Sequence, residues 1–290
     1  MIQKKRDRDK KAKVKKPMSF LSRFFAYLIM IIFAFMTIYP IAWLIMNSFK
    51  STREFQVNQL GLPKVVTFSN YVEAWKMGDF ALLFPNSLIY TIGATVGIIL
   101  LSLLAGFAFG KLHSRATGPM YGSFMIGILL TTQTLMIPLF LEVNLFGIYN
   151  TRFAVLLVYI GAGLPIGIYL ATEYIRSIPT ALVESARIDG AGFFTIFRKI
   201  IVPMSKPVST TIAILNISNI WNEFAIINIL VSKTELKSLP LGIYKFSGSL
   251  STDYGKQFAA LTIGMVPMLV FYVIFRKQIT KGVAAGAVKG

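Results

Sequence analysis

The residue types that usually carry out covalent chemistry are scarce in this chain. It contains no cysteine, which excludes disulfides, thiolate metal sites and cysteine nucleophiles. Its single histidine, His113, lies in a short polar connection, and we interpret it as a solvated loop residue rather than a metal ligand. The pairs Gly110-Lys111 and Gly255-Lys256 lack the earlier glycine and the following Ser or Thr of a phosphate-binding loop. We therefore expect no covalent chemistry, and no metal or cofactor held by this chain.

A polar segment, ESARIDGAGFFTIFRKIIVP (residues 184–203), lies between two long apolar runs. The pattern predicts a helix from about Thr180 to Asp189-Gly190, where glycine can adopt the left-handed conformation of a C-terminal cap. A second amphipathic piece follows, and Pro203 and Pro207 end it. Its apolar residues recur at helical spacing: Phe193, Ile196, Phe197, Ile200 and Ile201. This stripe could lie along a membrane interface or fill a groove on a soluble partner, and the sequence leaves both open.

Polar side chains also occur inside two apolar runs, where they are costly in lipid and should face protein or water. They are Thr131 to Thr134 in one run, and Asn216, Asn219, Asn222, Glu223 and Asn228 in another. The candidates for a solute route among them are Thr131, Thr132, Gln133, Asn219, Asn222 and Glu223. Such residues either form hydrogen bonds between helices or line a route for a solute. Both interpretations remain open from the sequence.

The elements that would position these residues follow from composition. The chain has 290 residues, of which 55% are hydrophobic and 14% charged, so it is too apolar for a soluble globule. Six apolar runs match the ~20 residues needed to cross a bilayer core. They cover approximately residues 24–46, 86–109, 120–141, 153–172, 208–231 and 258–275. Glycines spaced by four predict close helix packing at Gly93 and Gly97, Gly106 and Gly110, and Gly163 and Gly167. We predict an all-α integral membrane protein with six transmembrane helices in one domain, residues 20–281.

The formal net charge of +18 is unevenly distributed. Of the 30 Lys and Arg residues, 21 lie in the segments on one side of the predicted membrane. These segments precede the first run, join the second to the third and the fourth to the fifth, and follow the sixth. The positive-inside rule places that face, both termini and the loop 173–207 in the cytoplasm. Residues 1–19 form a basic tail, predicted to be disordered, whose charges fix topology and can contact anionic lipid. No aromatic residues interleave these charges, so we expect no nucleic-acid partner.

The polar segment resembles the coupling loop of the inner-membrane permeases of binding-protein-dependent ABC importers. That family carries Glu-Ala-Ala, three residues, Gly, nine residues, then Ile-x-Leu-Pro. Here the corresponding residues are Glu184-Ser185-Ala186, Gly190 and Ile200-Ile201-Val202-Pro203, with Ser185 and Val202 as small departures. DGAGFFTIFRKIIVPMSKP, the WNEF of residues 221–224 and the terminal KGVAAGAVKG are similar to the second permease subunit of maltose-type importers. The resemblance covers the chain from the first apolar run to the end.

The resemblance implies that the polar segment is a coupling helix contacting an ATP-hydrolysing subunit, and that this partner binds ATP and Mg²⁺. The implied contact residues are Glu184, Ser185, Ala186, Asp189, Gly190, Ala191, Ile200 and Pro203. A Gly-rich C-terminal tail, residues 282–290, would add Gly286, Lys289 and Gly290. The implied partners are a second, homologous permease subunit, two ATP-binding cassette subunits and an extracellular solute-binding protein. The implied location is a bacterial cytoplasmic membrane.

We therefore expect a permease subunit, without an ATPase site of its own, that moves a di- or oligosaccharide by alternating access. Three alternatives stay open. The solute could be something other than a sugar, such as a phosphorylated polyol. The chain could be a secondary transporter or channel that works alone, or a membrane scaffold without transport activity.

Overall fold

The computed structural model describes residues 20–112, 114–246 and 253–287, with side chains described as far as residue 278. Within these ranges the chain forms helices and turns and contains no strand. The all-α prediction is confirmed. The basic tail and His113 lie outside the described residues.

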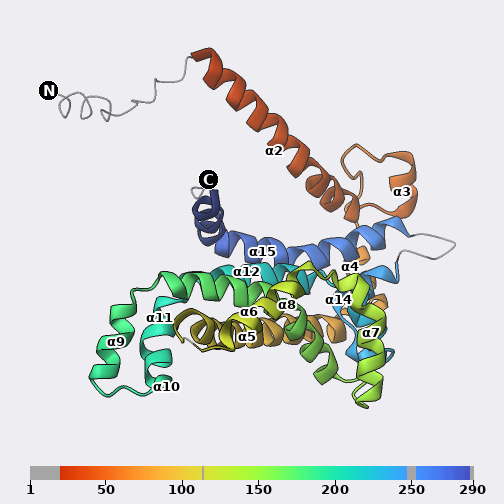
Figure 1. Cartoon of the computed structure of the whole chain (residues 1–290). Coiled ribbons are helices and arrows are strands. Elements are labelled where there is room, and N and C mark those ends of the chain that lie inside the picture. Colours follow the sequence, from red (N-terminus) through yellow and green to blue (C-terminus); the bar gives the residue numbers. More distant parts are fainter. Residues whose placement is uncertain (1–19, 113, 247–252, 288–290) are drawn as a thin grey trace.

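Four helices in the described ranges are each long and apolar enough to cross a membrane without a break. They are α2 (Phe20–Ser48), α5 (Phe80–Lys111), α8 (Arg152–Ser177) and α15 (Tyr254–Ala287). These four contain the first, second, fourth and sixth predicted runs. One end of the bundle carries α3 (Thr52–Val57), α4 (Ser69–Met77), the turn η2 (Thr234–Leu236) and α14 (Leu239–Tyr244). The other end carries α9 (Thr180–Ile188), α10 (Phe193–Ile196), the π-helical turn η1 (Phe197–Ile201) and α11 (Val202–Met204) (Figure 1).

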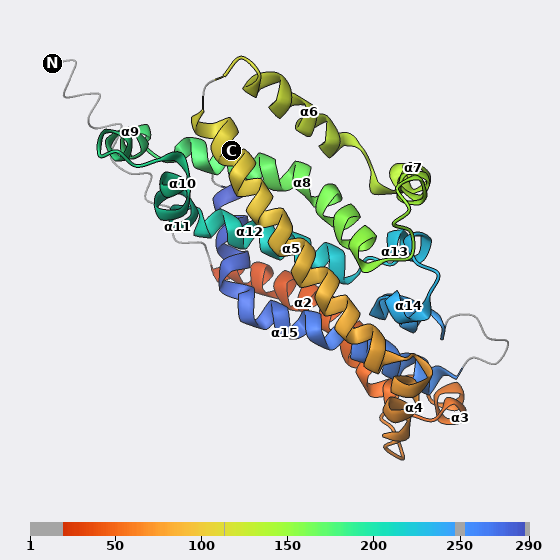
Figure 2. The same ribbon diagram turned by 90° about the horizontal axis from the view of Figure 1, so that it is seen from below.

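The third predicted run is a bent pair rather than one helix. It forms α6 (Thr117–Leu129) and α7 (Thr132–Leu145), whose axes differ by 109° (Figures 1 and 2). Thr131 has an extended backbone between them, and its hydroxyl lies 2.7 Å from that of Thr134. Threonine is β-branched and can hydrogen-bond locally, and both properties favour such a non-helical residue.

The fifth predicted run is also discontinuous. Its main helix, α12 (Lys206–Trp221), stops before Glu223, and α13 (Ala225–Leu230) follows. At its other end, α12 is bent by 71° from the segment Phe193–Met204. Pro203 and Pro207, which lack backbone N–H donors, flank this second bend. Counting each bent pair as one span gives up to six spans in the described residues.

The α5–α8 pair forms the most extensive helix contact, and the predicted glycine pairs explain its closeness. A Cβ atom added at Gly97 would lie 2.6 Å from Ile160, and one at Gly106 would lie 2.8 Å from the Ala171 Cβ atom. From the opposite side, a Cβ atom at Gly167 would clash with Ser102. Missing side chains therefore let the backbones approach, as small residues do in membrane helices.

The first part of helix α2 projects away from the rest of the bundle (Figure 1), whereas its later part contacts α15, where the Trp43 ring packs on the Phe258 ring. None of its most apolar 18-residue window is buried within the chain, whereas its last residues, Asn47 and Ser48, are fully buried. The start of α2 and the last turn of α15 lie toward the end that carries α9 (Figure 1). The apolar surface of α2 is thus available to lipid or to another subunit.

Candidate functional site

A cavity of about 280 Å³ lies between the start of α7, the middle of α8, the end of α12 and α13. Its polar wall consists of Thr132, Gln133, Asn216, Asn219 and Glu223. Its apolar wall includes Tyr159, Ala162, Ile166, Leu215 and Ile226. Two breaks in helices border it, because α7 begins at Thr132 and α12 ends at Trp221. The cavity therefore combines hydrogen-bonding groups with apolar surface beside two helix breaks.

Glu223 occupies the break between α12 and α13. Its Oε1 atom accepts a hydrogen bond from the Ile226 N–H at 2.6 Å, and its Oε2 atom accepts one from the Ile227 N–H at 3.3 Å. The Tyr159 hydroxyl donates to Oε2 at 2.7 Å. The carboxyl group thus satisfies N–H groups that the break leaves without helical partners. Glu223 both forms a hydrogen bond to another helix and lines the cavity, so the two interpretations of its sequence position are compatible.

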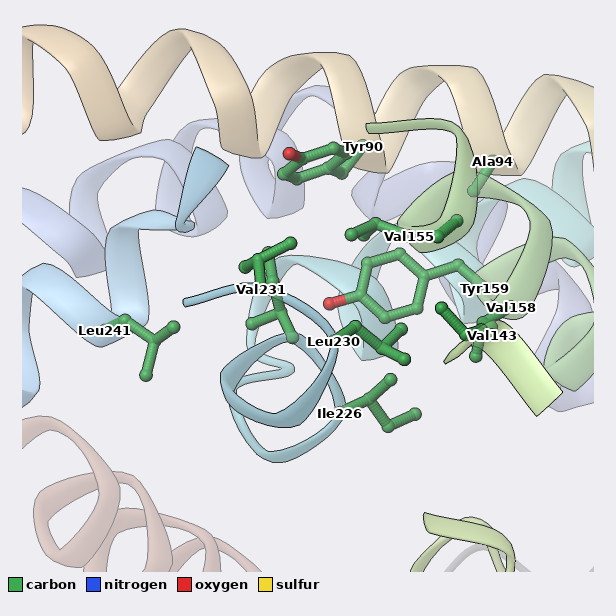
Figure 3. Packing of buried hydrophobic residues seen from close by; sticks show 12 residues of the cluster. Tyr90, Ala94, Val143, Val155, Val158, Tyr159, Ile226, Leu230, Val231 and Leu241 are labelled. Carbon is green, nitrogen blue, oxygen red and sulfur yellow. The ribbon is translucent and has the colours of Figure 1, made fainter. Parts of the chain in front are cut away.

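Tyr159 holds the two sides of the site together. Only 4% of its surface is exposed, and it packs with Val155 and Val158 of α8 and with Ile226 and Leu230 of α13. Figure 3 shows its hydroxyl directed toward the α13 segment. A single tyrosine in an apolar run carries no distinguishing sequence signal, so sequence reasoning missed it.

The other predicted path residues are divided by the structure. Thr132, Gln133 and Asn219 line the cavity together with Glu223. Thr131 and Asn222 do not line the cavity. The Thr131 hydroxyl pairs with that of Thr134, and the Asn222 side chain donates a hydrogen bond to the Ser218 carbonyl at 2.8 Å. Asn216 also lines the cavity, although it was noted only as a polar residue of this run and was not among the candidates for the route. It lies on the same face of α12 as Asn219, three residues away, and that spacing could have identified it.

The predicted cap of the polar segment is present. Helix α9 ends in a Schellman arrangement, in which the Gly190 N–H donates to the Arg187 carbonyl and the Ala191 N–H donates to the Ala186 carbonyl. Gly190 has a φ of +79°, the left-handed conformation that glycine adopts without penalty. The prediction of a glycine cap at this position is confirmed.

The apolar stripe after this turn packs against the chain's own bundle. Ile196, Phe197 and Ile201 are buried in a cluster with Phe107 of α5 and Ile175 of α8. The Phe107 ring also lies 4.6 Å from the Phe193 ring, centroid to centroid. Both sequence interpretations of the stripe, a membrane interface and a partner groove, are therefore wrong for its buried residues. The sequence indicated an apolar face but not what covers it.

The outer face of the segment remains exposed. Glu184, Ser185, Asp189, Gly190 and Pro203 are solvent-exposed, whereas Ala186, Ala191 and Ile200 are half-buried against the bundle. Two large apolar side chains lie beside the exposed residues, with Ile188 86% exposed and Phe194 69% exposed. The contact role of the eight predicted residues stays a prediction.

A family model described as "Binding-protein-dependent transport system inner membrane component" matches residues 98–284, which include the cavity and the polar segment. The chain belongs to this family. It is therefore an inner-membrane component of a transport system. Membership of this permease family implies that ATP is handled by other subunits.

Curated relatives of this permease match it over most of its length. It is 32% identical over 252 residues to the probable ABC transporter permease protein YurM of Bacillus subtilis, covering 87% of this chain and 84% of the relative. It is 31% identical to the probable starch degradation products transport system permease protein AmyC of Thermoanaerobacterium thermosulfurigenes, covering 89% and 94%. It is 32% identical to the trehalose transport system permease protein SugB of Mycobacterium tuberculosis, covering 87% and 92%.

A solved structure shares the fold of this permease. It is a bacterial ABC transporter involved in the import of the acidic polysaccharide alginate, with a TM-score of 0.81 and 23% sequence identity. The match covers 90% of this chain and 98% of that chain.

Of the predicted tail contacts, Gly286 lies within α15 beyond the described side chains, and Lys289 and Gly290 lie outside the described residues.

Proposed function

We propose that this permease imports a sugar, with the cavity between α7, α8, α12 and α13 as part of the route. The polar wall of the cavity carries this proposal. The amides of Gln133, Asn216 and Asn219 offer donors and acceptors that suit hydroxyl groups, and apolar residues form the opposite wall. The relatives named for starch degradation products and trehalose support a sugar as the solute.

The charge of the cavity favours an uncharged solute over a phosphorylated one. None of the described residues that line it is Lys or Arg, and its one charged group is the Glu223 carboxyl. A phosphate group would have no cationic partner there and would face this carboxyl group. The phosphorylated polyol is therefore the weaker alternative.

The test is ATP-dependent uptake by vesicles that contain the assembled complex, with radiolabelled trehalose, raffinose and maltooligosaccharides as probes. Gln133→Ala and Asn219→Ala should each raise KM about fivefold, because each removes a hydrogen bond worth ~1 kcal/mol. Asn222→Ala is the matched control, because its side chain hydrogen-bonds within α12 outside the cavity. Equal KM values for all three variants would contradict the route, and uptake of none of the sugars would contradict the solute class.

We also propose that α9, the Gly190 turn and α10 contact an ATP-binding cassette subunit on the cytoplasmic side. The exposed residues Glu184, Asp189, Ile188 and Phe194 would form the contact, and ATP with Mg²⁺ would be bound in the partner. The excess of Lys and Arg on this face supports its cytoplasmic location. On the same proposal, Gly286, Lys289 and Gly290 contact this partner, and the opposite end of the bundle faces a solute-binding protein.

The absence of cysteine makes this contact testable by site-specific crosslinking. A cysteine at the exposed position Ile188 should crosslink to a surface lysine of the ATPase subunit through a short reagent that carries a maleimide and an amine-reactive ester. Val57→Cys is the control, because Val57 is 87% exposed but lies in α3 at the opposite end. Equal crosslinking at both positions, or none at Ile188→Cys, would contradict the contact. The unburied apolar surface of α2 supports a second permease subunit in the complex, and co-purification with a tagged partner tests this.

A further inference from the structure

The end of α5 beside α9 carries a buried cation. Lys111, the last residue of α5, is 9% exposed. Its Nζ atom donates hydrogen bonds to the carbonyl oxygens of Arg176 at 3.2 Å and Ile178 at 2.5 Å. A longer contact of 3.4 Å reaches the Thr180 Oγ1 atom. These three acceptors come from the last turn of α8, its C-terminal cap and the first residue of α9.

The cost of burying this ammonium group is offset by carbonyl groups rather than by an acid. No described carboxylate forms an ion pair with Lys111. The last carbonyls of a helix lack helical partners and carry the negative end of its dipole, so they stabilise a cation placed there. Lys111 therefore acts as a cap for α8 that is supplied by a neighbouring helix.

The position of this cap matters because α8 and α9 meet at a weak joint. Ile178 and Pro179 separate the two helices, and Pro179 has no N–H with which to continue the hydrogen bonding. Beside it, α5 and α8 are in close contact, since a Cβ atom at Gly110 would lie 3.3 Å from Ile175. Lys111 reaches from this contact across the joint to Thr180.

The other end of α5 is equally anchored. The Asn86 amide donates to the carbonyls of Glu235 and Lys237, and the Tyr90 hydroxyl donates to that of Leu236. Helix α5 has 32 residues and is about 48 Å long at 1.5 Å per residue. It therefore connects the α8–α9 joint at one end of the bundle to the η2 turn at the other.

We propose that Lys111 is a positioning residue that passes displacement of α9 to α5 during the transport cycle. Without it, motion of α9 would be absorbed at Ile178-Pro179 instead of moving the long helices. This inference rests on the proposed contact between α9 and an ATPase subunit. A cation in this place is a mechanical link, because it binds two helices and the joint between them with one side chain.

The experiment compares Lys111→Met, which keeps the length and removes the donors, with Lys206→Met, an exposed lysine at the same end. Both are made in a chain that carries Ala162→Cys as a reporter in the cavity wall. The full complex in vesicles is assayed for ATP hydrolysis and for labelling of the reporter by an impermeant maleimide, with and without ATP and vanadate. Neither readout requires knowledge of the solute.

We expect ATP hydrolysis by Lys111→Met to stay within about twofold of that of the unmutated complex. The change in labelling rate that ATP induces should become about tenfold smaller, which is the effect of losing a charged hydrogen bond. Lys206→Met should keep both. Lys111→Gln, which retains one donor group, should be intermediate and decides the matter if the methionine variant does not assemble. An unchanged labelling response in Lys111→Met overturns the proposal. Failure of both Lys111→Met and Lys111→Gln to assemble also overturns it.

The crosslink at Ile188→Cys separates the two proposals. If it forms and Lys111→Met still responds to ATP, only the role of Lys111 is wrong. If it does not form, the ATPase contact is wrong whatever the lysine does.

Discussion

Replacing Gly190 tests the geometry of the α9–α10 turn. Its φ is +79°, and a Cβ atom placed there would meet nothing within 4 Å, so Gly190→Ala adds no clash. The cost is purely conformational, about 1–2 kcal/mol for an L-residue in the left-handed region. Gly192 is a matched control two residues away. It also has open space around a Cβ atom, but its φ is −68°, which alanine adopts freely.

The strained turn can relax only by opening the hydrogen bonds that end α9, including the one from Ala191 to Ala186. We therefore expect Gly190→Ala to weaken binding of the purified ATPase subunit about 5–30-fold, the factor that corresponds to 1–2 kcal/mol. Gly192→Ala should leave the Kd within about twofold. Gly190→Asn should fall between them, because asparagine tolerates the left-handed region better than alanine.

The assay is titration of ATPase subunit onto the permease in detergent, with circular dichroism as a check that each variant is folded. Equal affinities for the two alanine variants would refute the reasoning, because both have the same side chain and the same open surroundings. Only the backbone conformation distinguishes them.

Three further outcomes are expected. Gly106→Ala should lower the free energy of unfolding by about 1–3 kcal/mol through overpacking at α5–α8, whereas Gly161→Ala, which meets nothing within 4 Å, should not; thermal denaturation of the detergent-solubilised chain checks this. Tyr159→Phe should cost about 1–3 kcal/mol, because it removes the hydroxyl donor to Glu223, and stability equal to that of the unmutated chain would show that this hydrogen bond is not formed. Burial opposes ionisation of Asp253, but hydrogen bonds to its carboxylate outweigh burial and lower its pKa below 3.8. Asp253→Asn should therefore destabilise the fold at neutral pH and lose this effect as the pH falls below about 4. A difference in stability between the two chains that persists at pH 2 would contradict this.

The sign of the last effect follows from linkage. A carboxyl group whose pKa is lower in the folded state stabilises the fold above its unfolded pKa of ~3.9. This contribution disappears as both states become protonated. Because the Asp253 side chain is 40% exposed, we expect less than about 1 kcal/mol.

The sequence predicted the positions of the apolar segments and their close packing better than it predicted helix continuity. Hydropathy registers whether a run can lie in lipid, and it identified all six runs. It does not register that the Thr131 hydroxyl pairs locally, or that the Glu223 carboxyl group satisfies the N–H groups of a break. Thr131 divides the third run and Glu223 divides the fifth, and Glu223 also lines the cavity.

The candidate site was predictable where backbone geometry dictates residue type and not where tertiary contacts do. An Asp-Gly pair after an amphipathic helix predicted the cap at Gly190. The helical spacing identified an apolar stripe, but only the fold shows that Phe107 and Ile175 cover it. Tyr159 and Lys111 gave no signal, because their roles depend on acceptors 64 and 67 residues away in sequence.

The exposed apolar window of α2 has a consequence for the membrane insertion and the unfolding of this protein. A helix with no buried apolar window gains little from packing within its own chain, so the bilayer alone holds most of its length in place. It can therefore insert before the other spans have been synthesised. In a denaturation experiment on the isolated chain, the cooperative signal will come from the bundle around α5 and α8, and α2 will contribute helicity that melts independently or not at all.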